Sequence, residues 1–129
     1  MVMSQHLYHQ LEDLLGILSA RAVSRLFLVT GKNSYSSCGA ESRLSNIFDQ
    51  YRESHKALDV TRYSDFSANP QLTDVERGIR QFRRSDAELI VAVGGGSVLD
   101  MAKSIGLLAA QGAKDQAATV HGASTVDSY

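Results

Sequence analysis

The amino-acid sequence predicts an α/β fold in which helices cover a parallel sheet, and two observations carry this prediction. The apolar runs at residues 26–30 and Leu89–Val93 have the length and unbroken hydrophobicity of strands buried on both faces. Segments with helical periodicity precede, separate and follow these runs. Such alternation is typical of a parallel sheet, because parallel strands need long crossover connections.

The first half of the chain contains two expected helices and two expected strands. Leucines recur at helical spacing over residues 5–20, with polar residues on the opposite face, namely Leu7, Leu11, Leu14, Leu15 and Leu18. After the strand at 26–30, residues 41–52 form a second helix whose apolar side holds Leu44, Ile47, Phe48 and Tyr51. Residues 58–63 are a weaker strand candidate.

The second half repeats the pattern. Asn69-Pro70 ends an irregular segment, and Thr73 with Glu76 three residues later predicts a capping box for a helix that runs to about Arg84. Its apolar side holds Val75, Ile79 and Phe82. The strand Leu89–Val93 and a helix over 97–110, capped by Ser97, complete an expected domain of residues 1–110. Residues 111–129 lack a sustained period and are expected to be a flexible tail or an interrupted connection.

Length, net charge and cysteine content argue against several classes of protein. A chain of 129 residues fits one domain, and a net charge of −1 provides no bulk attraction to nucleic acid or to acidic lipid. No apolar stretch approaches the roughly 18–20 residues of a membrane span, and residues 1–4 carry no basic region typical of a signal peptide. A single cysteine, Cys38, favours a reducing compartment, so we expect a cytoplasmic protein.

Three minor features have competing interpretations. His6, His9 and Glu12 could share a metal-binding helix face, but an exposed polar face explains the same residues. Cys38 lacks the neighbours of a reactive thiol. Four arginines crowd one predicted helix and fit a solvated face better than a phosphate patch; they are Arg77, Arg80, Arg83 and Arg84.

The most informative stretch joins the strand Leu89–Val93 to the next helix through Gly94, Gly95 and Gly96. Glycines let backbone N–H groups approach a ligand, and a new helix adds unpaired amides and the positive end of its dipole. A plain strand-to-helix turn usually needs one glycine. Three glycines followed by Ser97 therefore predict a phosphate or pyrophosphate site.

This stretch also carries a resemblance. Gly94-Gly95-Gly96-Ser97-x-x-Asp100-x-x-Lys103 is similar to the GGGSxxDxxK signature of the iron-containing (group III) alcohol dehydrogenase family. Residues 26–30 resemble its first nucleotide-binding strand, and Asn69-Pro70 resembles a dipeptide at its cofactor cleft. Within the family, residues 30–35 and 63–70 look most like the branch that reduces phosphonoacetaldehyde.

The resemblance implies a Rossmann-like domain, the N-terminal half of the dehydroquinate synthase-like fold, which binds a nicotinamide dinucleotide. Gly95, Gly96 and Ser97 would hold the pyrophosphate, and the family pattern adds Asn69 and Asp100 as cofactor contacts. Lys103 matches the motif, either as a ligand contact or as a structural salt bridge. The related dehydroquinate synthase and glycerol-phosphate dehydrogenase groups are an alternative, but their loops differ after the third glycine. Ser97, Asp100 and Lys103 favour the alcohol dehydrogenase family.

The end of the strand 26–30 bears on the choice of cofactor. Members of the family that prefer NAD carry an acidic residue there, whereas this chain has Gly31, followed by Lys32, Asn33 and Ser34. A 2′-phosphate would not be repelled, and Lys32 could pair with it. NADP(H) is therefore favoured over NAD(H), with Gly31, Lys32 and Ser34 as candidate contacts.

The family also implies a metal, Fe²⁺ or Zn²⁺, which one Asp and three His of a C-terminal helical domain bind and which polarises the substrate carbonyl. None of these ligands can be placed in this sequence, where His121 stands alone near the end. We therefore expect an oxidoreductase reduced to its cofactor-binding part, inactive alone and a homo-oligomer. The alternative is a non-catalytic nucleotide-binding or oligomerising module.

Overall fold

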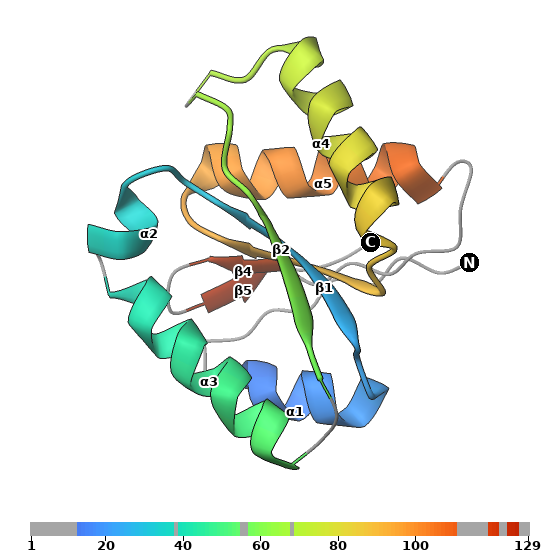
Figure 1. Cartoon of the computed structure of the whole chain (residues 1–129). Coiled ribbons are helices and arrows are strands. Elements are labelled where there is room, and N and C mark those ends of the chain that lie inside the picture. Colours follow the sequence, from blue (N-terminus) through green and yellow to red (C-terminus); the bar gives the residue numbers. More distant parts are fainter. Residues whose placement is uncertain are drawn as a thin grey trace.

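The computed structural model describes residues 13–37, 39–54, 57–67, 69–110, 119–121 and 124–126. Its centre is a three-stranded parallel sheet of β1 (Arg25–Thr30), β2 (Asp59–Tyr63) and β3 (Leu89–Val93), in the order β2-β1-β3 (Figure 1). Every residue of β3 is buried, as expected of a strand covered on both faces. The predicted α/β fold is confirmed.

Helices cover both faces of this sheet (Figure 1). The four long helices are α1 (Asp13–Arg21), α3 (Ala40–Ser54), α4 (Leu72–Ser85) and α5 (Gly96–Ala110). Leu26 and Leu28 of β1 pack in one hydrophobic cluster with side chains of α1 and α3. Phe27 and Val29 pack in a second cluster with side chains of α4 and α5. Because successive side chains of a strand point to opposite faces, one buried strand supports two cores.

Most expected elements occur within two residues of their predicted bounds. The exception at the N-terminus is α1, which is described from Asp13 onward, so residues 5–12 of the predicted helix lie outside the described part. His6, His9 and Glu12 lie outside it too, as does Cys38. A short helix that the sequence did not predict, α2 (Ser34–Ser37), follows the turn after β1.

The predicted start of α4 was wrong. The helix begins at Leu72, and the Asp74 carboxylate accepts a hydrogen bond from the main-chain N–H of Gln71 at 2.9 Å. The main-chain N–H of Asp74 donates in return to the Gln71 carbonyl at 3.0 Å. Asp74 thus takes the place expected of Glu76, because Gln71 is the capping residue and Asp74 is the third residue of the helix.

The C-terminal segment contains regular structure that the sequence did not predict. Two short strands, β4 (Thr119–His121) and β5 (Ser124–Val126), pair antiparallel, and β4 lies against β3. His121 pairs with Ser124 in this ladder. The other residues expected to form a flexible tail lie outside the described ranges.

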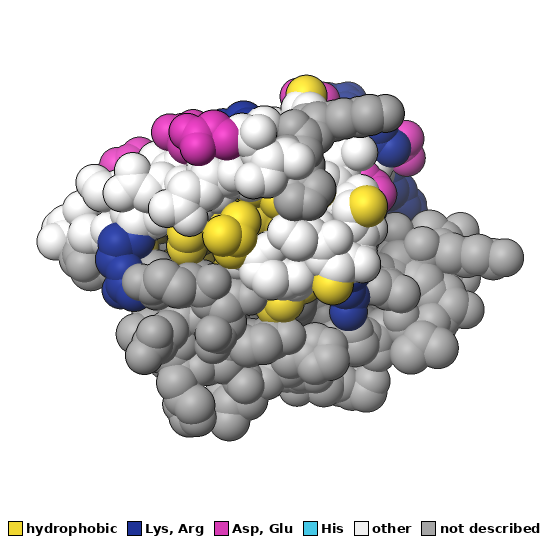
Figure 2. Space-filling model, turned by 90° about the horizontal axis from the view of Figure 1, so that it is seen from below, with side chains coloured by type: hydrophobic (Ala, Val, Ile, Leu, Met, Phe, Trp, Pro, Cys, Tyr) yellow, Lys and Arg dark blue, Asp and Glu magenta, His cyan; other side chains and the backbone are white. Residues whose placement is uncertain are grey.

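One face of the molecule exposes hydrophobic side chains (Figure 2). Seen from below, a group of hydrophobic side chains reaches the surface, and charged side chains lie around this group (Figure 2). None of the helices in the described part is long and apolar enough to cross a membrane.

Candidate functional site

The strand order places a topological switch point between the ends of β1 and β3. After β1 the chain passes through α3 to β2 on one side, and then returns through α4 to β3 on the other side. Ligands of open parallel sheets bind at such a switch point, beyond the carboxyl ends of the strands. Thr30 is the register partner of Val93, so the next residues, Gly31 and Gly94, leave the sheet side by side.

The three glycines of the loop after β3 have different roles. A Cβ on Gly94 would lie 2.6 Å from Cγ2 and 2.9 Å from Cβ of Val98, so the fold itself requires glycine at this position. A Cβ on Gly95 or Gly96 would meet no atom within 4 Å. The turn therefore needs one glycine, and the other two border open space that a ligand can enter.

Helix α5 begins one residue earlier than expected. The Gly95 carbonyl accepts the N–H groups of Val98 and Leu99, both at 3.1 Å. Gly95 is thus the capping residue, and the prediction of Ser97 as N-cap was wrong because the glycine backbone already makes the turn. Within the described part of the chain, the N–H groups of Gly96 and Ser97 have no acceptor, as expected at a helix start.

Asp100 and Lys103 follow on α5. Asp100 is exposed, whereas Lys103 is half-buried and has an interaction partner. The structure therefore leaves the Asp100 carboxylate accessible one turn into the helix. A ligand contact for Lys103 stays a prediction.

An arginine that the sequence analysis missed lies at the end of β1. Arg62 of β2 donates from Nε to Thr30 Oγ1 at 2.8 Å and from Nη2 to the Gly31 carbonyl at 3.1 Å. Its guanidinium lies 4.7 Å from the ring centre of Tyr35 on α2. Burial raises the pKa of Tyr35, and the charge of Arg62 opposes this rise, so the ring is neutral at pH 7. The sequence did contain a signal for this residue: Arg62 is a positively charged residue in the predicted strand 58–63, one residue before the end of that strand.

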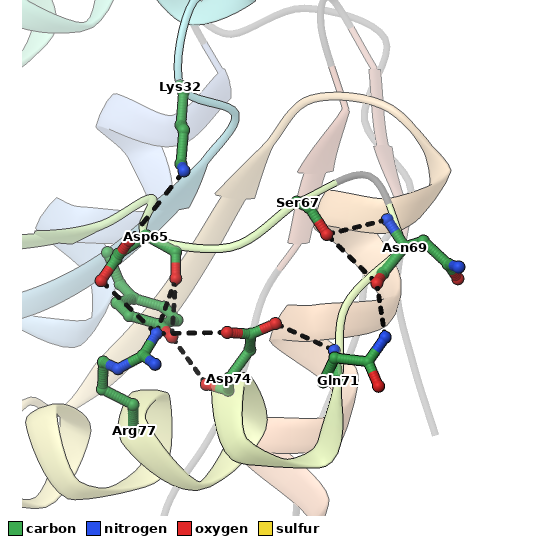
Figure 3. A network of polar contacts seen from close by, with 8 residues as sticks. Lys32, Asp65, Ser67, Asn69, Gln71, Asp74 and Arg77 are labelled. Atoms are coloured by element: carbon green, nitrogen blue, oxygen red, sulfur yellow. Dashed lines mark hydrogen bonds and ion pairs between the residues drawn. The ribbon is translucent and has the colours of Figure 1, made fainter.

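Lys32 points toward a row of charged side chains on the α4 side of the same edge (Figure 3). Its Nζ lies 4.0 Å from the Asp65 carboxylate. Arg77 Nη1 lies 3.4 Å from the same carboxylate and 3.2 Å from that of Asp74. Tyr63 donates its hydroxyl to the Asp74 carbonyl at 2.6 Å, and burial raises the pKa of this phenol. Lys32 therefore lies at this edge of the sheet and is paired with the Asp65 carboxylate.

The loop before α4 fixes the backbone of Asn69. The Ser67 hydroxyl donates to the Asn69 carbonyl at 3.1 Å and accepts its N–H at 3.3 Å. The side chain of Asn69 is exposed and points away from the other labelled residues (Figure 3). The serine thus leaves the amide group available to a ligand.

The sequence-predicted residues accordingly gather at one edge of the sheet. Gly31, Lys32 and the start of α2 at Ser34 follow β1, while Asn69 lies beyond β2 and the glycine loop follows β3. For the metal of the resembled family, the described residues do not fit: no three His, Cys, Asp or Glu side chains among them gather into a binding group.

Known proteins share this architecture. The model of a family described as iron-containing alcohol dehydrogenase matches residues 5–127. The long-chain primary alcohol dehydrogenase AdhA of Thermoanaerobacter ethanolicus is 28% identical over 99 residues, which is 77% of this chain and 24% of the relative. The NADH-dependent butanol dehydrogenase A of Clostridium acetobutylicum is 30% identical over 95 residues, 72% of this chain and 23% of the relative.

A solved structure agrees in fold. Sulfoacetaldehyde reductase from Bifidobacterium kashiwanohense, crystallised in complex with NAD+, superposes with a TM-score of 0.64 at 23% identity, covering 88% of this chain and 28% of that one. The chain thus spans about a quarter of the length of these relatives. Since the family model matches nearly the whole sequence, the chain belongs to the iron-containing alcohol dehydrogenase family.

Proposed function

We propose that the edge formed by the ends of β1 and β3 binds a nicotinamide dinucleotide. The observation that carries this proposal is the open space at Gly95 and Gly96, next to the unpaired N–H groups of Gly96 and Ser97. Amides at a helix start favour anions, and a pyrophosphate can approach them only where no Cβ intervenes. Gly94 is the structural glycine of this cradle.

The other predicted residues would surround the pyrophosphate, each with a role of its own. The exposed Asp100 carboxylate accepts from a hydroxyl or amide of the cofactor, and the Asn69 side chain donates from across the sheet edge. Ser34 opens α2 beside Gly31 and Lys32. Lys103 supports the loop from one turn further into α5.

The function that follows is hydride transfer from NAD(P)H to an aldehyde or, in the reverse direction, from an alcohol to NAD(P)+. The names of the relatives, a butanol dehydrogenase and a long-chain primary alcohol dehydrogenase, support this reaction class. Phosphonoacetaldehyde as the substrate rests on the sequences of residues 30–35 and 63–70 alone.

We favour NADP(H) over NAD(H), although the butanol dehydrogenase is named for its NADH dependence. At the end of β1 this chain has Gly31 where an acidic side chain would repel a 2′-phosphate. Lys32 and Arg62 put two cations at this point.

Residues 1–110 form the nucleotide-binding unit in this proposal, and a metal that polarises the substrate would need ligands from beyond the described residues. The chain alone should therefore bind cofactor without turning it over. Leu107 and Leu108 of α5 are 46% and 38% exposed, which supports self-association through this end of the helix.

Calorimetric titration of the purified 129-residue chain with NADPH and with NADH tests the proposal. We expect saturable one-site binding of at least one of the two, and competition by free pyrophosphate. A folded chain, verified by circular dichroism, that binds neither nucleotide would contradict it.

A further inference from the structure

The guanidinium of Arg62 is held in place by its own protein. Two of its nitrogens donate hydrogen bonds, Nε to Thr30 Oγ1 and Nη2 to the Gly31 carbonyl, and its Cζ lies over the ring of Tyr35, 4.7 Å from the ring centre. An arginine so fixed loses little further conformational entropy when it binds an anion. The side chain is thus preorganised at the end of β1.

The positive charge of Arg62 is not neutralised in the described part of the chain. No carboxylate there forms an ion pair with it, and Nη1 has no partner there. The nearby acidic side chains Glu41 and Asp65 contact groups other than Arg62. Glu41 accepts from the Ser36 hydroxyl at 2.9 Å, and Asp65 lies between Lys32 and Arg77. An exposed, oriented cation without a counter-charge is suited to a mobile anion.

The position of the Arg62 guanidinium indicates which phosphate group of a dinucleotide it would bind. The proposed pyrophosphate site is on the loop after β3, and Gly31 and Gly94 directly follow the register partners Thr30 and Val93. A nucleoside that extends from the pyrophosphate toward β1 brings its ribose over Gly31, whose carbonyl Arg62 holds. A phosphate on the 2′ position of that ribose would reach the free face of the guanidinium.

We propose that Arg62 is a specificity-determining residue that recognises the 2′-phosphate of NADP(H). This inference rests on the proposed dinucleotide site and adds to it a residue from β2. Lys32 lies on the α4 side of Gly31 and Arg62 on the α2 side, so the two cations flank the ribose position. Arginine suits this role because its planar fork binds phosphate oxygens in pairs.

A purely structural role for Arg62 makes a different prediction. If the residue only ties β2 to the turn after β1, its loss would loosen the site for every nucleotide. If it contacts the 2′-phosphate, its loss would weaken the phosphorylated cofactor alone. Comparing cofactors that differ by this one group separates the two roles.

The experiment titrates the wild-type chain, Arg62→Gln and the control Arg80→Gln with NADPH and with NADH. Arg80 is an exposed arginine of α4, so the control removes the same charge elsewhere on the surface. We expect Arg62→Gln to lose about tenfold to a hundredfold in NADPH affinity, with NADH affinity unchanged. The control should leave both affinities at the wild-type level.

Each other outcome overturns the inference. Equal losses for both cofactors would assign Arg62 a structural role, and no loss for either would assign it none. Wild-type binding of NADH without any advantage for NADPH would reject the inference but leave the dinucleotide site intact. If the wild type binds neither cofactor, the proposed function fails as well.

A measurement on the wild type covers the case in which Arg62→Gln does not fold. Adenosine 2′,5′-bisphosphate should shift the Nε resonance of Arg62 in a nitrogen-15 NMR spectrum, and adenosine 5′-monophosphate should leave it in place. Arg62→Lys, which keeps the charge but not the paired geometry, assigns that resonance by its disappearance. Identical shifts with both nucleotides, or no shift with either, would contradict recognition of the 2′-phosphate.

Discussion

Gly94 and Val98 are in such close contact that a methyl group on the glycine would lie 2.6 Å from a methyl of the valine. The same loop leaves open space at Gly95 and Gly96. One loop thus separates a residue required by packing from two that leave room for a ligand. This division makes the roles of the glycines testable one at a time.

Gly94→Ala should destabilise the fold, because Val98 is buried and its contacting atoms include the rigid Cβ. Overpacking of this kind costs about 1–3 kcal/mol in the free energy of unfolding. Gly96→Ala is the matched control and should keep or slightly raise stability, since alanine is favoured over glycine in a helix. Urea unfolding of the two variants checks this, and equal stabilities would contradict it.

Gly96→Val should fold and yet lose cofactor binding. The added side chain would occupy the space in front of the amides and displace two or three hydrogen bonds to the pyrophosphate. Affinity should fall by a factor of about a hundred or more. Gly16→Val is the control, since a Cβ at this exposed glycine of α1 also meets no atom within 4 Å. Unchanged affinity in a folded Gly96→Val protein would refute the pyrophosphate cradle.

Gly31→Asp should reverse the order of cofactor affinities. A carboxylate at the end of β1 would repel a 2′-phosphate and accept hydrogen bonds from ribose hydroxyls. We expect NADPH to bind more tightly than NADH in the wild type and more weakly in the variant. Asn33→Asp adds the same charge two positions away and should change the order less. Calorimetry that ranks NADH first in the wild type would reject the prediction.

Tyr51 should make stability sensitive to alkaline pH. Its hydroxyl donates to the Val23 carbonyl at 2.6 Å, and burial raises its pKa above the ordinary value of 10.0. The unfolded state therefore loses this proton first, so the stabilisation is complete below pH 10 and declines as pH rises toward the folded pKa. Tyr51→Phe should lose about 1–2 kcal/mol at pH 7 and decline less steeply in alkali. Urea unfolding from pH 7 to pH 11 gives both quantities, and parallel declines would contradict the assignment.

The chain alone should not oxidise NADPH with an aldehyde when Fe²⁺ or Zn²⁺ is added. A metal that polarises a carbonyl supplies several kcal/mol of transition-state stabilisation, and the described residues gather no group to hold it. Absorbance of the reduced nicotinamide would report any turnover. Metal-dependent activity of the purified chain, free of longer species, would disprove the prediction.

The sequence predicted the sheet and its helices because apolar periodicity is strong where both faces are buried. The apolar runs that contain Leu28 and Val91 are typical of buried strands, and the side chains of both runs are buried in the structure. The helix starts were less predictable. Ser97 and Thr73 are good capping residues by type, but Gly95 and Asp74 provide the caps, because neighbouring backbone geometry decides which group reaches the free amides.

The glycine loop could be predicted as a site, since three successive glycines exceed the needs of a turn. Arg62 could not, because its contacts with Thr30 and Gly31 depend on the pairing of β2 with β1, which local sequence does not encode. The pairing of Lys32 with Asp65 was missed for the same reason. Long-range polar contacts are known only once strand order is known.

The 4.0 Å pair between Lys32 and Asp65 changes what a phosphate gains at this edge. An anion that draws Lys32 toward itself must displace a carboxylate that Arg77 continues to hold. Binding through Lys32 is then an exchange of one anion for another, and its net strength is smaller than that of a lysine without a partner. Asp65 would in this way compete with a bound phosphate for the Lys32 ammonium.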